Sequence, residues 1–184
     1  MLDFIKVGRT EKVIQLELDY YMLKNGAEAL SFDTIALSGS NTSLPHGVPS
    51  DKKVESGEFV LMDFGATYEG WHSDMTRTVC VGKPSDKMKS VYETVLTAQL
   101  AALDAVKAGM SGKALDKIAR DIITEAGYGE NFGHSLGHGV GVEIHESPYA
   151  SPSREDILPE NSIVTVEPGI YLELSLIHIS EPTR

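Results

Sequence analysis

The sequence predicts an α+β fold built from a repeated unit. Helix-like and strand-like segments are interspersed without regular βαβ alternation, and no glycine-rich phosphate loop follows a strand. The helix-like stretches 8–26 and 109–127 match at an offset of 101 residues, and FVLMDFGATYE matches IVTVEPGIYLE at an offset near 104. Amphipathic helices are alike in general, but the second match also aligns Asp63 with Glu167, each two residues before a glycine. We therefore expect a pseudo-duplicated domain.

Three segments have the apolar spacing of amphipathic helices. The first has Thr10 as its N-cap, the second follows Pro84–Ser85, and the third begins at Ser111. Hydroxyl side chains at these positions can accept a hydrogen bond from a backbone N–H of the first helical turn. Each segment ends at a glycine, which readily adopts the conformation that stops a helix; these are residues 26, 109 and 127.

Four shorter segments have the composition of strands: 34–37, 58–63, 75–81 and 162–167. A turn around 67–70 separates the second from the third. We expect this turn to form a tight hairpin that places the neighbouring strands side by side.

Composition and charge exclude several classes of function. The chain has 184 residues, with 16 Lys and Arg against 27 Asp and Glu, and a formal net charge of −11. Binding to nucleic acid or to anionic lipid requires basic clusters, and the sequence has none. No apolar run approaches the ~18 residues that a membrane span needs, and no signal peptide is recognisable. The single Cys80 fits a reducing compartment. These features predict a soluble, cytoplasmic protein.

Two acidic residues occupy positions that suggest a shared site. Asp63 ends a strongly apolar run, and Asp74 opens the next strand. The expected hairpin would bring both carboxylates together, where they would repel each other unless a cation lies between them. A divalent metal ion supplies that charge. The alternative is an unrelated pair, one Asp at a strand end and one in a turn.

A second cluster is FGHSLGHGVGVEIHESP, in which His134, His138 and His145 are interleaved with four glycines. Glu167 then repeats the arrangement of Asp63 at the end of an apolar run. Carboxylates with one imidazole suit Mn, Co, Fe or Zn, and bridging carboxylates suggest two ions. Two ions can activate a water and polarise a carbonyl, which makes hydrolysis the natural chemistry. Ser-His-Asp catalysis is less favoured, because the sequence has no nucleophile elbow.

Five motifs resemble the pita-bread metallopeptidases, the family of methionine aminopeptidase, prolidase and Xaa-Pro aminopeptidase. They occur in the order of that family, within a resemblance that covers about residues 8–173: SFDTIALSG, LPHG, MDFGATYEGWHSDMTRT, GHSLGHGVGVEIHE and VTVEPGIY. The resemblance implies a pita-bread (creatinase/aminopeptidase) fold, whose pseudo-two-fold repeat agrees with the duplication inferred above.

The resemblance also implies roles for individual residues. Asp63 would bind one metal ion, Asp74 would bridge two, and His138 and Glu167 would bind the second. It further implies proton transfer by Glu167, contact of His46 and His145 with the substrate amide and its developing charge, and a substrate pocket lined by His134 and Tyr171. The implied cofactor is a pair of divalent ions, with manganese expected first and cobalt, zinc and iron as alternatives.

Within the family, the paired GHSxGHG motif resembles the proline-specific subgroup. The expected function is hydrolysis of the Xaa-Pro bond at the N-terminus of peptides that carry proline at the second position, by a parent protein that forms homo-oligomers. The alternatives are a prolidase acting on Xaa-Pro dipeptides, a non-catalytic pita-bread binding protein, and a different reaction on this scaffold such as creatine hydrolysis.

The ends of the chain depart from the family pattern. We expect 1–173 to be a partial catalytic domain, truncated at both ends, and 174–184 to be a non-native tail. The tail reads LSLIHISEPTR, which resembles a translated sequencing adapter, so His178 is not expected to be a ligand. The family's fifth, bridging ligand would be absent, and we expect this chain to retain metal poorly and to have little activity.

Overall fold

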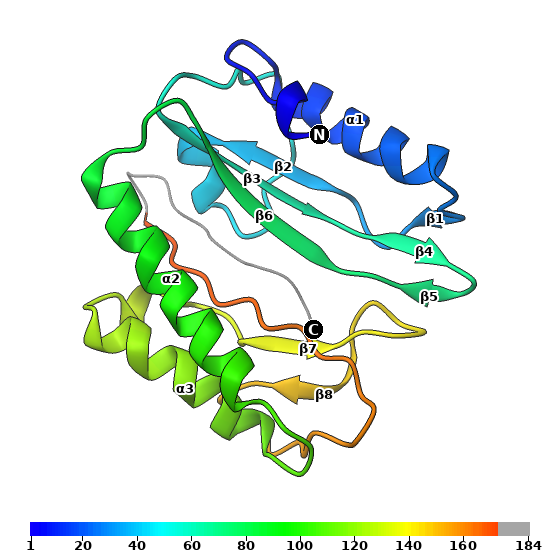
Figure 1. The fold of residues 1–184 in the computed structure, drawn as a ribbon, viewed down its shortest axis with the longest axis vertical. Helices are drawn as coiled ribbons and strands as arrows, with labels where there is room; N and C mark the ends of the chain where they lie inside the picture. The colour runs from blue at the N-terminus through cyan, green and yellow to red at the C-terminus, as the bar shows by residue number, and fades with distance from the viewer. Residues whose placement is uncertain (173–184) are drawn as a thin grey trace.

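The structure, a computed structural model, describes residues 1–172, and its fold is α+β as the sequence predicts. The expected tail 174–184 lies outside the described residues and stays a prediction. In Figure 1, one helix accompanies the strands of the first half, and two helices lie side by side along the strands of the second half. The site described below lies where these two halves meet.

The three predicted helices are α1 (Glu11–Lys24), α2 (Asp86–Ala105) and α3 (Gly112–Glu125). Each starts directly after the expected Thr or Ser, and in each case that hydroxyl accepts the backbone N–H three residues further on. The helix caps are therefore confirmed. α2 ends earlier than its glycine suggested, because Val106 already has extended backbone angles.

Within residues 1–172, antiparallel strands form three small sheets. The order β2–β3–β6 makes the largest of them, and the others are β1–β4–β5 and β7–β8. The strand bounds are β1 Ala29–Leu30, β2 Ile35–Ser38, β3 Glu58–Phe64, β4 Ala66–Tyr68, β5 Trp71–His72, β6 Met75–Val81, β7 Gly137–Gly139 and β8 Glu146–Ala150. Short 3-10 helices are η1 Leu2–Phe4, η2 Gly39–Ser43 and η3 Gly129–Asn131. The strands expected at 34–37, 58–63 and 75–81 correspond to β2, β3 and β6.

The hairpin expected around 67–70 is confirmed. Tyr68 pairs with Trp71, and the two residues between them, Glu69 and Gly70, both have positive φ, at 50° and 77°. Such two-residue turns match the twist of an antiparallel pair. The hairpin extends the antiparallel β3–β6 pair, in which Asp63 lies opposite Thr76.

The fourth expected strand, 162–167, is not a regular strand. It runs antiparallel to β7, because Thr165 N donates to His138 O at 2.8 Å and Glu167 N donates to Leu136 O at 2.8 Å. The N–H of His138 is directed instead to the Thr165 hydroxyl, at 2.9 Å. This side-chain bond replaces one rung of the backbone ladder, which explains why the segment pairs irregularly.

The internal duplication is visible in equivalent hydrogen bonds of the two halves. Gly8 N donates to Val54 O at 2.9 Å, and Gly109 N donates to Leu158 O at 2.8 Å. The two donors, Gly8 and Gly109, are 101 residues apart, and the two acceptors, Val54 and Leu158, are 104 residues apart. These are the two offsets found in the sequence. The same relation connects the bridge of Thr10 with Lys53 to that of Ser111 with Ile157. The repeat is therefore structural as well as sequential.

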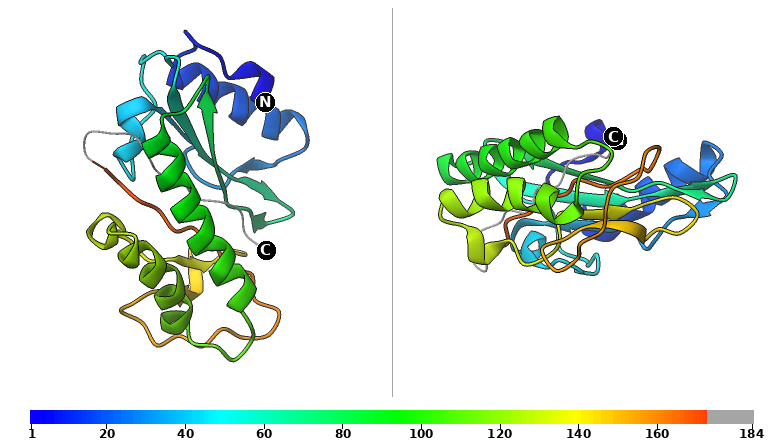
Figure 2. Two further views of the ribbon diagram at one scale, coloured as in Figure 1. Left: turned by 60° about the vertical axis from the view of Figure 1, so that its left-hand side comes forward. Right: turned by 90° about the horizontal axis from the view of Figure 1, so that it is seen from below.

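Two clusters of buried apolar side chains form the core, one mainly in each half. In the first half, Ile14 and Leu18 of α1 pack with residues of β2 and β3. In the second half, α2 and α3 pack on each other and on the segments around β7 and 164–170. Figure 2 shows α2 and α3 adjacent in both of its views. Within residues 1–172, no helix combines the length and the apolar character that a membrane crossing requires.

Candidate metal centre

Three of the four predicted metal ligands converge where the two halves meet. Asp74, His138 and Glu167 each offer a ligand atom, and all three atoms lie within 4.8 Å of one another. His138 Nε2 is 3.2 Å from Glu167 Oε1 and 3.4 Å from Asp74 Oδ2. Asp74 immediately precedes β6, His138 is the central residue of β7, and Glu167 ends the segment beside β7. Ligands from both halves are thus brought to one point.

Asp63, the fourth predicted ligand, is not one of this group of three but belongs to the same acidic centre. Its Oδ1 accepts a hydrogen bond from the Thr76 hydroxyl at 2.9 Å. Burial raises the pKa of its carboxyl, and the negative charges of Asp74 and Glu167 raise the pKa further, to about 7. This coupling shows that three carboxylates share one poorly solvated space.

Hydrogen bonds fix the orientation of the His138 ring and of the Glu167 carboxylate. His138 Nδ1 is 2.9 Å from the carbonyl oxygen of Gly139, and a carbonyl requires that this nitrogen carry the proton. Nε2 is thereby directed toward Asp74 and Glu167. The Thr165 hydroxyl accepts from His138 N and donates to Glu167 Oε1 at 2.7 Å, so one side chain orients both groups.

The pKa shifts at this centre reflect its excess of carboxylates. Burial by itself lowers the pKa of His138, but its hydrogen bonds to Asp74 and Glu167 outweigh burial and raise that pKa to about 10. Burial raises the pKa of Glu167, but the hydrogen bond and charge of His138 bring it below its ordinary value. A protonated imidazole therefore neutralises part of the acidic cluster. Buried carboxylates with one oriented imidazole fit a divalent cation, which would take over this role.

His134 and Tyr171 form one wall beside this centre. The Tyr171 hydroxyl is 2.9 Å from His134 Nε2, and His134 Nδ1 is 2.7 Å from the carbonyl oxygen of Ser135. Because Nδ1 must donate to that carbonyl, Nε2 of the neutral ring accepts from Tyr171. Burial lowers the pKa of His134, which favours this neutral form, and burial raises the pKa of Tyr171.

His46 and His145 are both exposed and both reach the same cavity. The His145 ring lies 4.3 Å from that of His138, measured between centroids. Burial, followed by the charge of His138, lowers the pKa of His145. His46 lies in the connection after η2, on the side of the first half.

A cavity of about 530 Å³ is lined by all eight predicted site residues. Its lining also includes apolar and aromatic side chains that sequence reasoning did not single out: Phe32, Ile35, Pro45 and Tyr149. Pockets of this size, with a few convergent polar groups on an apolar lining, are typical of small-molecule and peptide sites. Phe32, Ile35 and Pro45 lie in the motifs SFDTIALSG and LPHG, but these motifs do not indicate which of their apolar residues line a cavity.

A buried ion pair that supports the His134 wall also escaped sequence analysis. Arg120 donates to both carboxylate oxygens of Asp116, at 2.7 and 2.9 Å, and to the carbonyl oxygens of Phe132 and His134. Asp116 in turn accepts the Leu136 N–H at 3.0 Å. The i, i+4 spacing of Asp116 and Arg120 on α3 predicts a helical ion pair, but not that it fastens the segment 132–136.

Comparisons with known proteins show the family of the chain. The model of Metallopeptidase family M24 matches residues 1–181, and the chain belongs to that family. Its α+β pita-bread fold, as the sequence resemblance implied, is shared with solved structures of the family.

Among individual proteins, the chain is similar to an Xaa-Pro dipeptidase of Pyrococcus horikoshii, with 50% identity over 171 residues that cover 93% of this chain and 49% of that protein. It is 51% identical to the uncharacterized peptidase YqhT of Bacillus subtilis, covering 94% of this chain and 49% of the relative. The crystal structure of an X-Pro aminopeptidase from Thermotoga maritima matches with a TM-score of 0.94 and 50% identity, over 100% of this chain and 54% of that one. The chain thus spans about half the length of these relatives.

Proposed function

We propose that residues 1–173 are part of the catalytic domain of a metal-dependent peptidase that hydrolyses the Xaa-Pro bond at the N-terminus of peptides. The observation that carries this proposal is the convergence of Asp74, His138 and Glu167, with Asp63 coupled to them by charge, in a cavity of about 530 Å³. The names of similar proteins, Xaa-Pro dipeptidase and X-Pro aminopeptidase, support the choice of substrate bond.

The proposed cofactor is a pair of divalent ions, manganese first, with cobalt, zinc and iron as alternatives. Asp63, Asp74, His138 and Glu167 would hold them, since this oxygen-rich set with one imidazole suits these metals. When bound, such ions lower the pKa of water and polarise a peptide carbonyl.

The chain's own residues would position the peptide and move its proton. The Glu167 carboxylate would accept a proton from the attacking water and return it to the departing imide nitrogen of proline. His46 and His145, which reach the cavity from opposite halves, would contact the substrate amide and stabilise charge that develops on its carbonyl. His134 and Tyr171 would form the fixed wall against which the substrate lies.

The length of the accepted peptide separates two candidate functions. The sequence resemblance leans to an aminopeptidase that acts on longer peptides, whereas several similar proteins bear the name Xaa-Pro dipeptidase. Turnover of an Xaa-Pro dipeptide and of Xaa-Pro peptides of three to five residues, measured on the full-length protein, distinguishes them. Cleavage restricted to the dipeptide would establish the prolidase.

We also propose that the full-length protein is a homo-oligomer.

The metal assignment is tested by Asp74→Ala in the full-length protein. Changes around metal ligands cost ~10–100-fold in affinity or activity, so loss of a ligand should cost at least that much. The matched control is Asp121→Ala, because Asp121 is an exposed acid on α3. Metal titration and hydrolysis of an Xaa-Pro tripeptide are the measurements. Undiminished activity of Asp74→Ala would refute the assignment, and a full-length wild type that binds no ions would favour the non-catalytic alternative.

A further inference from the structure

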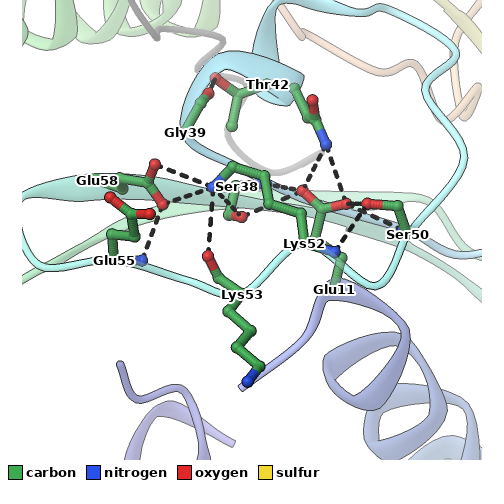
Figure 3. Close-up of polar contacts among 10 residues, drawn as sticks. Glu11, Ser38, Gly39, Thr42, Ser50, Lys52, Lys53, Glu55 and Glu58 are labelled. Atoms are coloured by element: carbon green, nitrogen blue, oxygen red, sulfur yellow. Dashed lines mark hydrogen bonds and ion pairs between the residues drawn. The ribbon is translucent and has the colours of Figure 1, made fainter. Parts of the chain in front are cut away.

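Glu11 is a buried carboxylate that the proposed chemistry does not use. It is the first residue of α1, and its exposed fraction is 0%. A buried carboxylate is costly unless hydrogen bonds compensate for the lost water. Glu11 accepts six: from Ser38 N at 2.7 Å, Ser38 Oγ at 3.1 Å, Asn41 Nδ2 at 3.0 and 3.2 Å, Ser50 N at 3.0 Å and Ser50 Oγ at 2.6 Å. Both oxygens are therefore engaged by donors from other parts of the chain (Figure 3).

These donors lie at the two ends of one connection. Ser38 ends β2, Asn41 lies in η2, and Ser50 follows the connection that contains Pro45 and His46. Oε1 accepts from Ser38, Oε2 accepts from Ser50, and Asn41 reaches both. A single carboxylate thus joins the start and the end of the segment 39–49.

A second set of contacts ties this arrangement to the central sheet. Lys52 Nζ donates to Ser38 Oγ at 3.1 Å and to the Glu58 carboxylate at 2.8 and 2.9 Å (Figure 3). Glu58 is the first residue of β3, the strand that contains Asp63. The Ser38 hydroxyl donates to Glu11 while it accepts from Lys52, so the ends of the segment are connected to β3 through hydrogen bonds.

In the middle of the segment Gly47 is buried, but the larger side chains on either side of it are exposed. Leu44 is 53% exposed and Val48 is 83% exposed, so the apolar side chains at the tip contribute little fixation. His46 lies between them and lines the cavity. The hydrogen bonds at the two ends of the segment therefore bear directly on where this imidazole lies.

We propose that Glu11 is a positioning residue, whose carboxylate fixes the segment 39–49 and through it the place of His46 at the cavity. This inference rests on the proposed function for the contact of His46 with substrate, but the anchoring of the segment can be measured without turnover. Small displacements of positioned groups are costly: about 1 Å can cost on the order of a hundredfold in rate.

The test compares Glu11→Gln with wild type in the full-length protein. The amide retains one acceptor oxygen and places an NH₂ group against donors, so the backbone amides of Ser38 and Ser50 should exchange with solvent at least about tenfold faster. We expect kcat/KM for an Xaa-Pro tripeptide to fall by roughly 10–100-fold, with unchanged binding of manganese. If Glu11→Gln fails to fold, Ser50→Ala removes only the 2.6 Å hydroxyl bond to Oε2 and serves in its place.

The matched control is Lys12→Gln. It breaks the Lys12–Asp51 pair, which joins the same helix to the same stretch of chain at 3.2 Å but is exposed on both sides. Exposed pairs contribute little, so amide exchange and turnover should remain those of wild type. Equal exchange of the Ser38 and Ser50 amides in Glu11→Gln and wild type would overturn the proposal.

A double-mutant cycle with His46→Ala separates positioning from general stability. If Glu11 acts through His46, Glu11→Gln should cause no further loss of kcat/KM in the His46→Ala background. Losses that multiply would overturn the proposal. If His46→Ala alone has full turnover, the proposed role of His46 fails, whereas faster exchange of the two serine amides in Glu11→Gln would still support the anchoring by Glu11.

Discussion

The ring of His138 shows how single atoms prepare this centre. Its Nδ1 is committed to the carbonyl oxygen of Gly139, its backbone N–H to the Thr165 hydroxyl, and its Nε2 to the carboxylates of Asp74 and Glu167. The hydrogen bonds of Nδ1 and of the backbone N–H thus orient the ring so that Nε2 faces the two carboxylates. The backbone oxygen accepts from Thr165 N, so the residue is held on all sides.

The protonation of this centre predicts that metal binding depends on pH. In the metal-free protein the pKa of His138 is raised to about 10 and that of Asp63 to about 7, so both hold protons near neutrality that a bound cation must displace. At neutral pH, binding of the cation should therefore release protons from this centre. Apparent affinity for manganese should therefore rise from pH 6 to pH 8.

Calorimetric titration in two buffers with different ionisation enthalpies measures this release directly. The measurement suits the full-length protein, and Asp121→Ala again provides a control that leaves the centre intact. A binding enthalpy that is the same in both buffers would contradict the prediction.

Among the elements, β7 depends on a close approach of two backbones. A Cβ added to Gly137 would lie 2.0 Å from the carbonyl oxygen of Thr165, whereas one added to Gly133 would meet no atom within 4 Å. Both glycines belong to the motif that was recognised in the sequence. Only Gly137 is required for β7 and the segment 162–167 to lie together.

Gly137→Ala should therefore force β7 away from Thr165 and displace His138. Overpacking of this kind costs about 1–3 kcal/mol, and we expect a lower midpoint of urea unfolding together with weaker manganese binding. Gly133→Ala is the matched control and should retain both properties. A Gly137→Ala protein with wild-type midpoint and affinity would show that the two segments can separate without consequence.

Elements determined by nearby residues were predictable from the sequence. The caps at Thr10 and Ser111 and the Glu69–Gly70 turn follow from local hydrogen bonding and backbone preference. The irregular segment 162–167 was not predictable, because its ladder is interrupted by the Thr165 hydroxyl that binds a residue 27 positions away. Glu11 was missed for the same reason, since its donors are 27 to 39 residues distant.

At the scale of the whole molecule, the candidate site is divided between the halves. Asp63 and Asp74 come from the first half, and His138 and Glu167 come from the second. The ligand motifs were recognisable in the sequence because each is short, and the repeat indicated that the two acids ending apolar runs are equivalent. The cavity itself required the structure, since the motifs do not indicate which of their apolar residues line it.

The duplication has a geometric consequence. Asp63 and Glu167 occupy equivalent places in the two halves, yet both line one cavity. Two equivalent residues related by a rotation can lie close together only near the rotation axis. An acidic residue near the axis in one half is therefore accompanied by an acidic residue from the other half. The repeat thus places the negative charges of both carboxylates in the same cavity. The equivalent of His138 in the first half is Leu37. The two sides of the axis therefore differ, because only the second half contributes an imidazole at this position.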